Sequence, residues 1–278
     1  MGSRAGEVIL EGRGLHTGSD ACIVLRRRTG AVAFVAAREV PLREAKVVGT
    51  DRATTLDLDG RRVATVEHLL AAFGGLGVFH GVSVEVIGPE VPLMDGGAVA
   101  FCRALRELGA QSGQGELEVV CEGQVTVGDS SYAFTVGDEL EVSVTVDFAD
   151  ARVAPEARWD GDPDDFCRRV APARTFAFAH EVEALARRGL ASHVTPESVV
   201  ILGDREVLAS GRPFLPDEPA RHKLLDLIGD LFLYGGPPRG AVRAHRPGHG
   251  ATRVALREAF QRGLVRRDPM ISSARDGQ

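Results

Sequence analysis

The chain has 278 residues, of which 44% are hydrophobic and 26% charged, and its formal net charge is −6. This balance is typical of a folded globular protein with one large or two ordinary domains, and it excludes disordered and fibrous classes. The negative charge argues against a nucleic-acid partner, and no segment has the roughly 18–20 apolar residues of a membrane span. Because Met1 to Glu7 contain no apolar signal core, we expect a cytoplasmic protein without an integral membrane segment.

Cysteine usage gives one further expectation. The four cysteines are far apart and form no C-x-x-C pair, which argues against a zinc ribbon or a dithiol redox motif. We expect all of them to be reduced and most of them to be buried; they are Cys22, Cys102, Cys121 and Cys167.

The first part of the chain predicts strands followed by two helices. Residues 7–63 alternate short apolar runs with glycine and polar turns, a pattern typical of strands. Residues 65–76 then show a helical pattern, with Thr65 as N-cap and Gly74-Gly75 as the stop. A strand is predicted at 82–86 and a helix at 98–108. The segment 111–115, rich in glycine and glutamine, is the best candidate for a domain boundary.

The second part repeats this order. Strands are predicted near 116–127, 131–137 and 140–147, followed by an irregular acidic stretch at 160–165. The remaining predicted elements are a helix at 180–188, a long helix at 218–234, a strand at 240–244 and a helix at 251–262.

The two parts also end alike. His68-Leu69-Leu70 is followed by Gly81, a strand and a helix, and His222 to Leu225 is followed by Gly240, a strand and a helix. We therefore predict an α+β fold of two similar domains, each with helices packed on a β-sheet, at residues 1–111 and 116–278.

A histidine and a carboxylate share one face of the long predicted helix. His222 and Asp226 are spaced i, i+4, so their side chains project together. Spacing alone leaves two interpretations open, a helix-surface hydrogen bond or a pair of metal ligands. The apolar residues Leu224, Leu227 and Ile228 predict that this helix is largely buried, and buried polar groups require partners.

A second pair of candidate residues, Glu67 and His68, lies at the start of the first predicted helix. Adjacent residues on a helix point about 100° apart, so if His68 binds a metal, Glu67 can face the water that the metal activates. The alternative is an exposed pair on a first helical turn. Two histidines and one carboxylate would leave a position for water on a tetrahedral zinc ion, as hydrolysis requires.

His249 lies between two glycines, in the connection between a predicted strand and a predicted helix. It can be a general acid that Asp230 orients and whose pKa Asp230 raises, or a solvated loop histidine. The residues alone leave both interpretations open.

These residues stand within motifs that resemble a known family. The sequence is similar to the UDP-3-O-acyl-N-acetylglucosamine deacetylases of lipid A biosynthesis across nearly its whole length. The matching stretches run in family order: Gly14 to Gly18, Thr65 to Leu69, Val91 to Gly96, Ala173 to Phe176, Arg188 to Leu190, Asp217 to Asp230 with gaps, and Gly248-His249.

The resemblance implies an active site between two α+β domains and a metal-dependent amidohydrolase. It implies that zinc, one ion per chain, is held by His68, His222 and Asp226, although such ligands also accept iron(II). The implied catalytic residues are the general base Glu67, the Thr175 hydroxyl that stabilises the oxyanion, and His249 oriented by Asp230.

The implied substrate is a UDP-sugar with a 3-O-acyl chain, and the product is acetate. By resemblance, Lys223 and Arg246 contact its polar or phosphate groups, Phe148 stacks near the uracil, and Phe176 belongs to an insert near 173–202 that lines the acyl-chain passage. We expect a monomer that acts on this substrate in lipid A assembly.

Some positions depart from the family pattern. Ser130-Ser131 replace a lysine, and Ala191 to Thr195 replace a glycine-rich turn. An alternative is therefore a diverged zinc deacetylase for another nucleotide sugar or acyl-amide. A further alternative is a binding protein of the same fold without activity.

Overall fold

The computed structural model describes residues 2–4, 6–182 and 198–268 of the chain. It contains several β-sheets and helices that alternate along the chain, which confirms the α+β class. Among these residues, no helix is both long and apolar enough to cross a bilayer.

The N-terminal half forms a six-stranded sheet of order β1-β2-β3-β9-β4-β5. Its strands are β1 (Gly2–Arg4), β2 (Glu7–Arg13), β3 (Asp20–Ala31), β4 (Ala33–Val35), β5 (Glu39–Pro41) and β9 (His80–Ile87). A short 3-10 helix η1 (Leu42–Glu44) leads to a small sheet of β6 (Lys46–Gly49), β7 (Thr55–Leu58) and β8 (Arg61–Val63).

The C-terminal half forms a five-stranded sheet of order β11-β12-β18-β13-β14. Its strands are β11 (Gly123–Val127), β12 (Ser130–Thr135), β13 (Leu140–Thr145), β14 (Glu156–Trp159) and β18 (Gly240–His245). Two smaller sheets complete this half: β10 (Leu117–Val119) with β19 (Val265–Arg267), and β15 (Thr175–Phe178) with β16 (Val199–Leu202) and β17 (Val207–Leu208).

The two large sheets share one topology. In both, the late strand lies in the middle: β9 pairs antiparallel with β3 and parallel with β4, and β18 pairs antiparallel with β12 and parallel with β13. The order β2-β3-β9-β4-β5 therefore repeats as β11-β12-β18-β13-β14. This repeat confirms the prediction of two similar α+β units, and the boundaries at 1–111 and 116–278 remain our proposal for where they divide.

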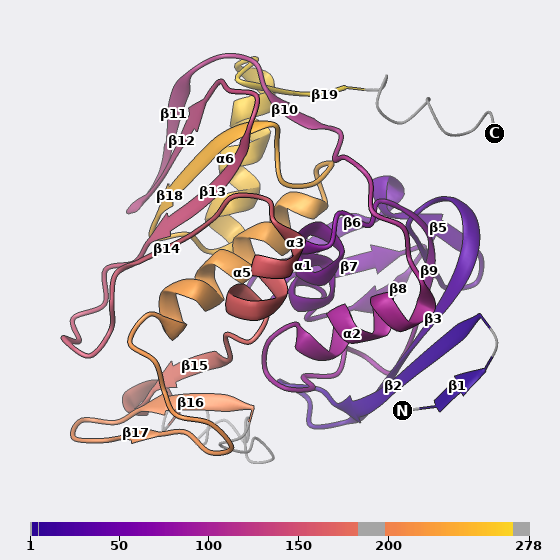
Figure 1. Ribbon diagram of the computed structural model, residues 1–278, viewed down its shortest axis with the longest axis horizontal. Coiled ribbons are helices and arrows are strands. Elements are labelled where there is room, and N and C mark those ends of the chain that lie inside the picture. The colour runs from indigo at the N-terminus through magenta and orange to yellow at the C-terminus, as the bar shows by residue number, and fades with distance from the viewer. Residues whose placement is uncertain (1, 5, 183–197, 269–278) are drawn as a thin grey trace.

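The helices lie between the two large sheets (Figure 1). They are α1 (Glu67–Gly75), α2 (Val99–Leu108), α3 (Pro163–Asp165), the π-helix η2 (Phe166–Val170), α5 (Glu218–Phe232) and α6 (His249–Gln261). α2 packs on β2 and β3, α5 and α6 pack on the five-stranded sheet, and α1 packs against α5. Helix α1, buried along its whole length, lies at the centre.

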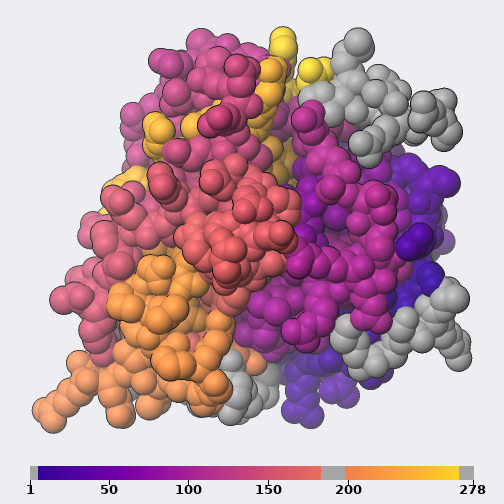
Figure 2. Space-filling model, viewed as in Figure 1, coloured from indigo at the N-terminus to yellow at the C-terminus, as the bar shows by residue number. Residues whose placement is uncertain are grey.

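One hydrophobic core crosses both halves. Residues of α1 such as Leu70 and Phe73 belong to the same buried cluster as Leu224 and Ile228 of α5. On the face viewed in Figure 2, the indigo-to-magenta N-terminal half and the C-terminal half, coloured from magenta-pink through orange to yellow, touch along their boundary. Residues from both halves can therefore meet in a rigid, water-poor environment.

Two local predictions were wrong. Thr65 does not cap α1, whose N-cap is Val66 without a side-chain hydrogen bond; instead, the Thr65 hydroxyl donates to Glu90. The acidic stretch 160–165 is partly helical, because Asp162 accepts a hydrogen bond from the Asp164 N–H and Pro163 occupies the first turn of α3. A third prediction, the helix at 180–188, is tested only at its start. The structure has helix at 179–182, and residues 183–188 lie outside the described part.

Glu90 joins the motif at 14–18 to the start of α1. Its fully buried carboxylate accepts hydrogen bonds from the Thr17 N–H at 2.8 Å, the Thr17 hydroxyl at 2.6 Å and the Thr65 hydroxyl at 2.9 Å. Gly14 permits this approach, since a Cβ there would lie 1.8 Å from Glu90 Oε1. Burial opposes the charge, but hydrogen bonds from His16, Thr17 and Thr65 lower the pKa of Glu90 to about 2.

We expect Glu90→Gln to lower the free energy of unfolding at pH 7 by about 3 kcal/mol, the equivalent of the shift from 4.5 to about 2. Because the folded pKa is depressed, this stability is present above pH 4.5 and is lost as the pH falls toward 2. Urea denaturation at several pH values measures it. A gap between variant and wild type that is constant from pH 7 to pH 3 would contradict the assignment.

Candidate metal and active site

Helices α1 and α5 approach closely where the site lies. A Cβ on Gly229 of α5 would lie 2.1 Å from the carbonyl oxygen of Glu67, so only glycine allows this contact. The contact places the first turn of α1, which carries Glu67 and His68, against the middle of α5, which carries His222 and Asp226. The predicted burial of α5 is confirmed, and it includes the polar residues of the helix except the partly buried Lys223.

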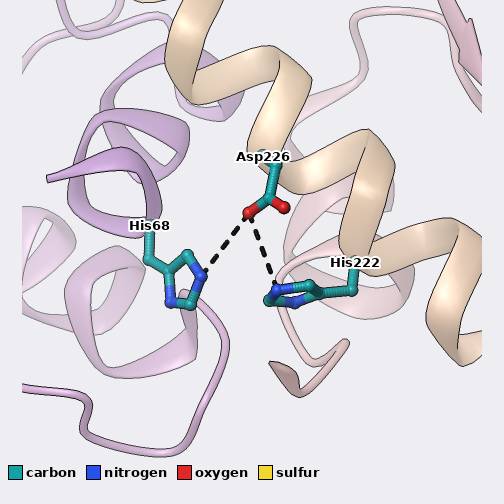
Figure 3. Close-up of side chains that lie close together, drawn as sticks. All are labelled: His68, His222 and Asp226. Carbon is teal, nitrogen blue, oxygen red and sulfur yellow. Dashed lines mark ion pairs between the residues drawn. The ribbon is translucent and has the colours of Figure 1, made fainter. Parts of the chain in front are cut away.

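Three predicted ligands converge. His68 Nε2 and His222 Nε2 each lie 3.6 Å from Asp226 Oδ1, and one ligand atom from each residue lies within 4.8 Å of the others. Figure 3 shows His68 reaching from α1 toward the two α5 residues. Ligands at 2.0–2.1 Å from one tetrahedral zinc ion would lie about 3.3 Å apart, close to the 3.6 Å between each histidine and Asp226.

The polar atoms of this cluster fit a cation. The side chains of His68, His222 and Asp226 are at least nine-tenths buried, and within the described part of the chain Asp226 Oδ1 has no hydrogen-bond donor. A buried carboxylate oxygen without a donor is costly, and a metal ion would satisfy it. Two imidazole nitrogens and one carboxylate oxygen are a donor set that suits zinc or iron(II).

His222 is oriented by a backbone carbonyl. Its Nδ1 lies 3.0 Å from the carbonyl oxygen of Ala173, so the proton resides on Nδ1 and Nε2 is free to ligate. Burial lowers the pKa of His222 to about 4, which keeps the ring neutral as ligation requires.

A buried ion pair holds this carbonyl in place. Arg174, which is fully buried, donates from Nε and its backbone N–H to Glu218 Oε1 at 2.9 and 3.1 Å. Glu218 begins α5, four residues before His222. The Arg174–Glu218 pair therefore fixes the segment that contains Ala173 against the helix that carries two of the three candidate ligands.

Lys223 contacts the cluster directly. Its ammonium donates to Asp226 Oδ2 at 2.8 Å and leaves Oδ1 for a cation. Burial disfavours the Asp226 carboxylate, but Lys223 and His222 hold the pKa of Asp226 well below its ordinary value. Burial likewise opposes the Lys223 charge, and Asp226 nevertheless raises the pKa of Lys223.

Glu67, Asp230 and His249 form a second group beside the candidate ligands. His249 Nδ1 lies 2.8 Å from Asp230 Oδ2, and His249 Nε2 lies 4.0 Å from Glu67 Oε1. Burial raises the pKa of Glu67. Burial disfavours the His249 imidazolium, but the Asp230 carboxylate outweighs it and raises the pKa of His249 to about 10. His249 is the first residue of α6 and not part of a loop.

Thr54, which no sequence pattern singled out, connects this group. Its backbone N–H donates to Glu67 Oε2 at 2.9 Å, and its hydroxyl donates to Asp230 Oδ1 at 2.7 Å. One buried residue thus binds the carboxylates of two helices. Neither its position before β7 nor any motif in the sequence signals this role, because half of it belongs to the backbone.

Phe176, Phe148 and Thr175 are predicted site residues outside the three candidate ligands. The Phe176 ring centroid lies 6.0 Å from that of His222 and 5.4 Å from that of Phe148, and the Lys223 ammonium lies 5.9 Å from the centre of the Phe176 ring. Thr175 begins β15 two residues after Ala173, with its backbone N–H on the Gly96 carbonyl.

Arg246 is half exposed and follows β18. Its guanidinium lies 3.9 Å from the carboxylates of Asp129 and Asp147, so two acidic groups face it where a phosphate was predicted to bind. Asp147 directly precedes Phe148 in the chain, so Arg246 lies near the segment that carries Phe148.

Known proteins match this chain over most of its length. The family model described as LpxC: UDP-3-O-acyl N-acetylglycosamine deacetylase matches residues 4–261. A UDP-3-O-acyl-N-acetylglucosamine deacetylase from Myxococcus xanthus is 35% identical over 90% of this chain and 83% of its own length. Proteins of the same name from Saccharophagus degradans and Anaeromyxobacter dehalogenans are 35% and 34% identical, each over 92% of this chain and over 88% and 86% of their own lengths. The chain therefore belongs to the UDP-3-O-acyl-N-acetylglucosamine deacetylase family.

Proposed function

We propose that this protein hydrolyses the N-acetyl group of a UDP-3-O-acyl-N-acetylglucosamine, releasing acetate and a free amine, as a step of lipid A biosynthesis. The observation that carries the proposal is the convergence of His68, His222 and Asp226 beside Glu67 in a member of this family. His68, His222 and Asp226 would hold the metal, with zinc as the proposed ion and iron(II) as the alternative.

A metal bound there would supply a Lewis acid that polarises the acetamide carbonyl and makes water nucleophilic near neutral pH. Glu67 takes the proton of the attacking water. Burial supports this role, because a raised pKa brings a carboxylate closer to the pH at which it must accept a proton.

His249 gives a proton to the leaving amine. With a pKa of about 10 it is protonated at neutral pH, and the Asp230 carboxylate on Nδ1 leaves Nε2–H directed toward Glu67. The proton acceptor and the proton donor thus face each other across 4.0 Å beside the ligand cluster. The Thr175 hydroxyl would donate to the oxyanion. Thr175 begins β15 two residues after Ala173, whose carbonyl oxygen contacts His222 Nδ1.

Aromatic and basic side chains support an acylated nucleotide sugar as the substrate. Phe148, Phe176 and Phe178 form one cluster with ring centroids 5.4–6.2 Å apart, an apolar surface next to the candidate ligands. Lys223 and Arg246 would provide charge for the polar and diphosphate groups. The insert near 173–202 would line the acyl-chain passage, and its residues 183–197 lie outside the described part. A cytoplasmic location and a monomeric state complete the proposal.

Acetate release from the acylated UDP-sugar and from UDP-N-acetylglucosamine tests the function. Faster turnover of the acylated compound is expected. Equal rates on both would argue against an acyl-chain passage, and turnover of neither would overturn the proposed substrate class. Elemental analysis of the purified protein identifies the metal independently of activity.

Thr54→Val should lower kcat about tenfold while metal content stays unchanged. The variant keeps the backbone N–H on Glu67 but removes the donor to a buried oxygen of Asp230, an effect worth about 1–3 kcal/mol. Thr54→Ser should restore the rate, because it restores the hydroxyl. Thr55→Val is the matched neighbouring control. A serine variant as slow as the valine variant would argue that only the shape of the side chain matters.

A further inference from the structure

Two of the four cysteines meet outside the candidate active site. All four are free thiols, but the expectation that most are buried was wrong: Cys102 is buried, Cys121 is exposed, and Cys22 and Cys167 are half-buried. Cys102 lies on α2 and Cys167 on η2; contacts on either side place the two thiols opposite each other, and each thiol shifts the pKa of the other. Neither contacts the candidate ligands, so the proposed hydrolysis has no use for this pair.

Contacts on both sides hold the two sulfurs together. One turn of α2 before Cys102, the Ala98 N–H donates to the carbonyl oxygen of Ala171 at 2.8 Å. One turn after it, Arg106 donates to Asp164 at 2.6 Å. Along the partner segment these contacts run in reverse order, at 171 and then 164, so Cys102 and Cys167 face each other between two contacts of antiparallel segments.

Close backbone packing adds to this frame. A Cβ on Gly97 would lie 2.3 Å from the carbonyl oxygen of Ala171, so the start of α2 lies directly on the segment after η2. In Figure 1 the helical turn α3, which leads into η2, lies beside α2. A disulfide between the two segments would require the sulfurs to come to a bonding distance of about 2 Å.

We propose that Cys102 and Cys167 are a redox modification site, a thiol pair that closes to an intramolecular disulfide on exposure to a peroxide. Cys167 is the thiol that a small oxidant reaches, since it is half-buried whereas Cys102 is 3% exposed.

The electrostatics of the pair favour Cys167 as the nucleophile. The neighbouring Cys102 thiol outweighs burial and, with the Arg106 guanidinium, lowers the pKa of Cys167 to about 7. The Cys167 thiol and burial together raise the pKa of Cys102, which stays protonated. At neutral pH, therefore, a substantial fraction of Cys167 is thiolate, the form that attacks peroxides.

The chemistry balances with hydrogen peroxide as the oxidant. The Cys167 thiolate attacks one peroxide oxygen, the O–O bond breaks, and the leaving hydroxide takes a proton to become water, which leaves a sulfenic acid on Cys167. The Cys102 sulfur then attacks the Cys167 sulfur, and the sulfenic hydroxyl leaves with the Cys102 proton as a second water. Two thiols are oxidised to one disulfide, and one peroxide is reduced to two waters.

Cys167 lies on a segment that leads to the candidate metal site. η2 continues through Ala171 to Ala173, whose carbonyl orients His222, and the carbonyl of Arg169 in η2 accepts from Arg221 of α5. A disulfide would tie this segment covalently to α2.

Mass spectrometry of the full-length protein tests the proposal. The protein is treated with hydrogen peroxide at pH 7, its free thiols are alkylated, and it is digested without reductant. We expect a peptide pair joined through Cys102 and Cys167, the loss of two of the four alkylatable thiols, and recovery of both with dithiothreitol.

Cysteine variants test whether the cross-link forms specifically between Cys102 and Cys167. Cys167→Ser should abolish the cross-link, and Cys121→Ser, at an exposed position, should leave it intact. In Cys102→Ala the sulfenic acid on Cys167 should accumulate and be trapped by dimedone. Irreversible oxidation of Cys167 beside an unmodified Cys102 thiol would overturn the proposal, as would a cross-link from either cysteine to Cys22 or Cys121.

Discussion

Glu67→Gln is expected to lower kcat for acetate release by about 10²–10⁴-fold with the metal still bound, because a general base contributes about that much. Glutamine has the same shape as glutamate and can still accept the backbone N–H of Thr54, which now lies 2.9 Å from Glu67 Oε2. It cannot take a proton from water. The measurement is kcat on the acylated UDP-sugar, with metal content determined on the same samples.

A matched control is available on α6. Glu258→Gln makes the same chemical change at a half-exposed side chain that pairs with Arg262, and it should leave kcat unchanged. Full activity in Glu67→Gln would contradict the assignment of the base. Loss of activity together with loss of metal would instead point to Glu67 as part of the metal's support.

His222→Ala is expected to lower the bound metal from about one ion per chain to nearly none and to abolish acetate release. Removal of this side chain deletes one of three ligands and leaves Asp226 with one histidine on its Oδ1. Changes that only orient a ligand typically cost 10–100-fold in metal affinity, and the loss of a ligand should cost more. Elemental analysis after dialysis measures the metal, and a spectroscopic probe such as cobalt substitution reports the ligand set.

His245→Ala is the control for this experiment. His245 is an exposed histidine on β18, so its loss should change neither metal content nor activity. A His222→Ala protein that keeps one metal per chain would exclude the proposed ligand set, whatever its activity. A folded variant without metal and without activity would support it.

Sequence reasoning found the candidate ligands but could not join them. The i, i+4 spacing of His222 and Asp226 follows from helix periodicity alone, and their burial followed from the apolar residues beside them. Nothing local related this helix to Glu67 and His68, which precede it by some 150 residues. In the sequence, only the similarity of the surrounding motifs to a known family links the two helices.

The residues that hold the site together were harder to predict. The Ala173 carbonyl and the Thr54 N–H act through backbone atoms, which every residue carries and no side-chain pattern marks. Thr65 was expected to cap α1, but tertiary contact with the buried Glu90 carboxylate redirected its hydroxyl. In each case a partner distant in sequence decided the interaction, and local propensity could not register it.

Helix and strand periodicities and turn residues act over a few positions, so the amino-acid sequence was sufficient to predict the fold class and the repeated order of elements. It also determined which side chains could bind a metal and, through its motifs, the family. The meeting of His68 Nε2, His222 Nε2 and Asp226 Oδ1 depends instead on the packing of α1 against α5 at Gly229, which local patterns do not encode. The tertiary structure also decided that Cys102 faces Cys167, because the frame between α2 and η2 is formed by residues more than 50 positions apart.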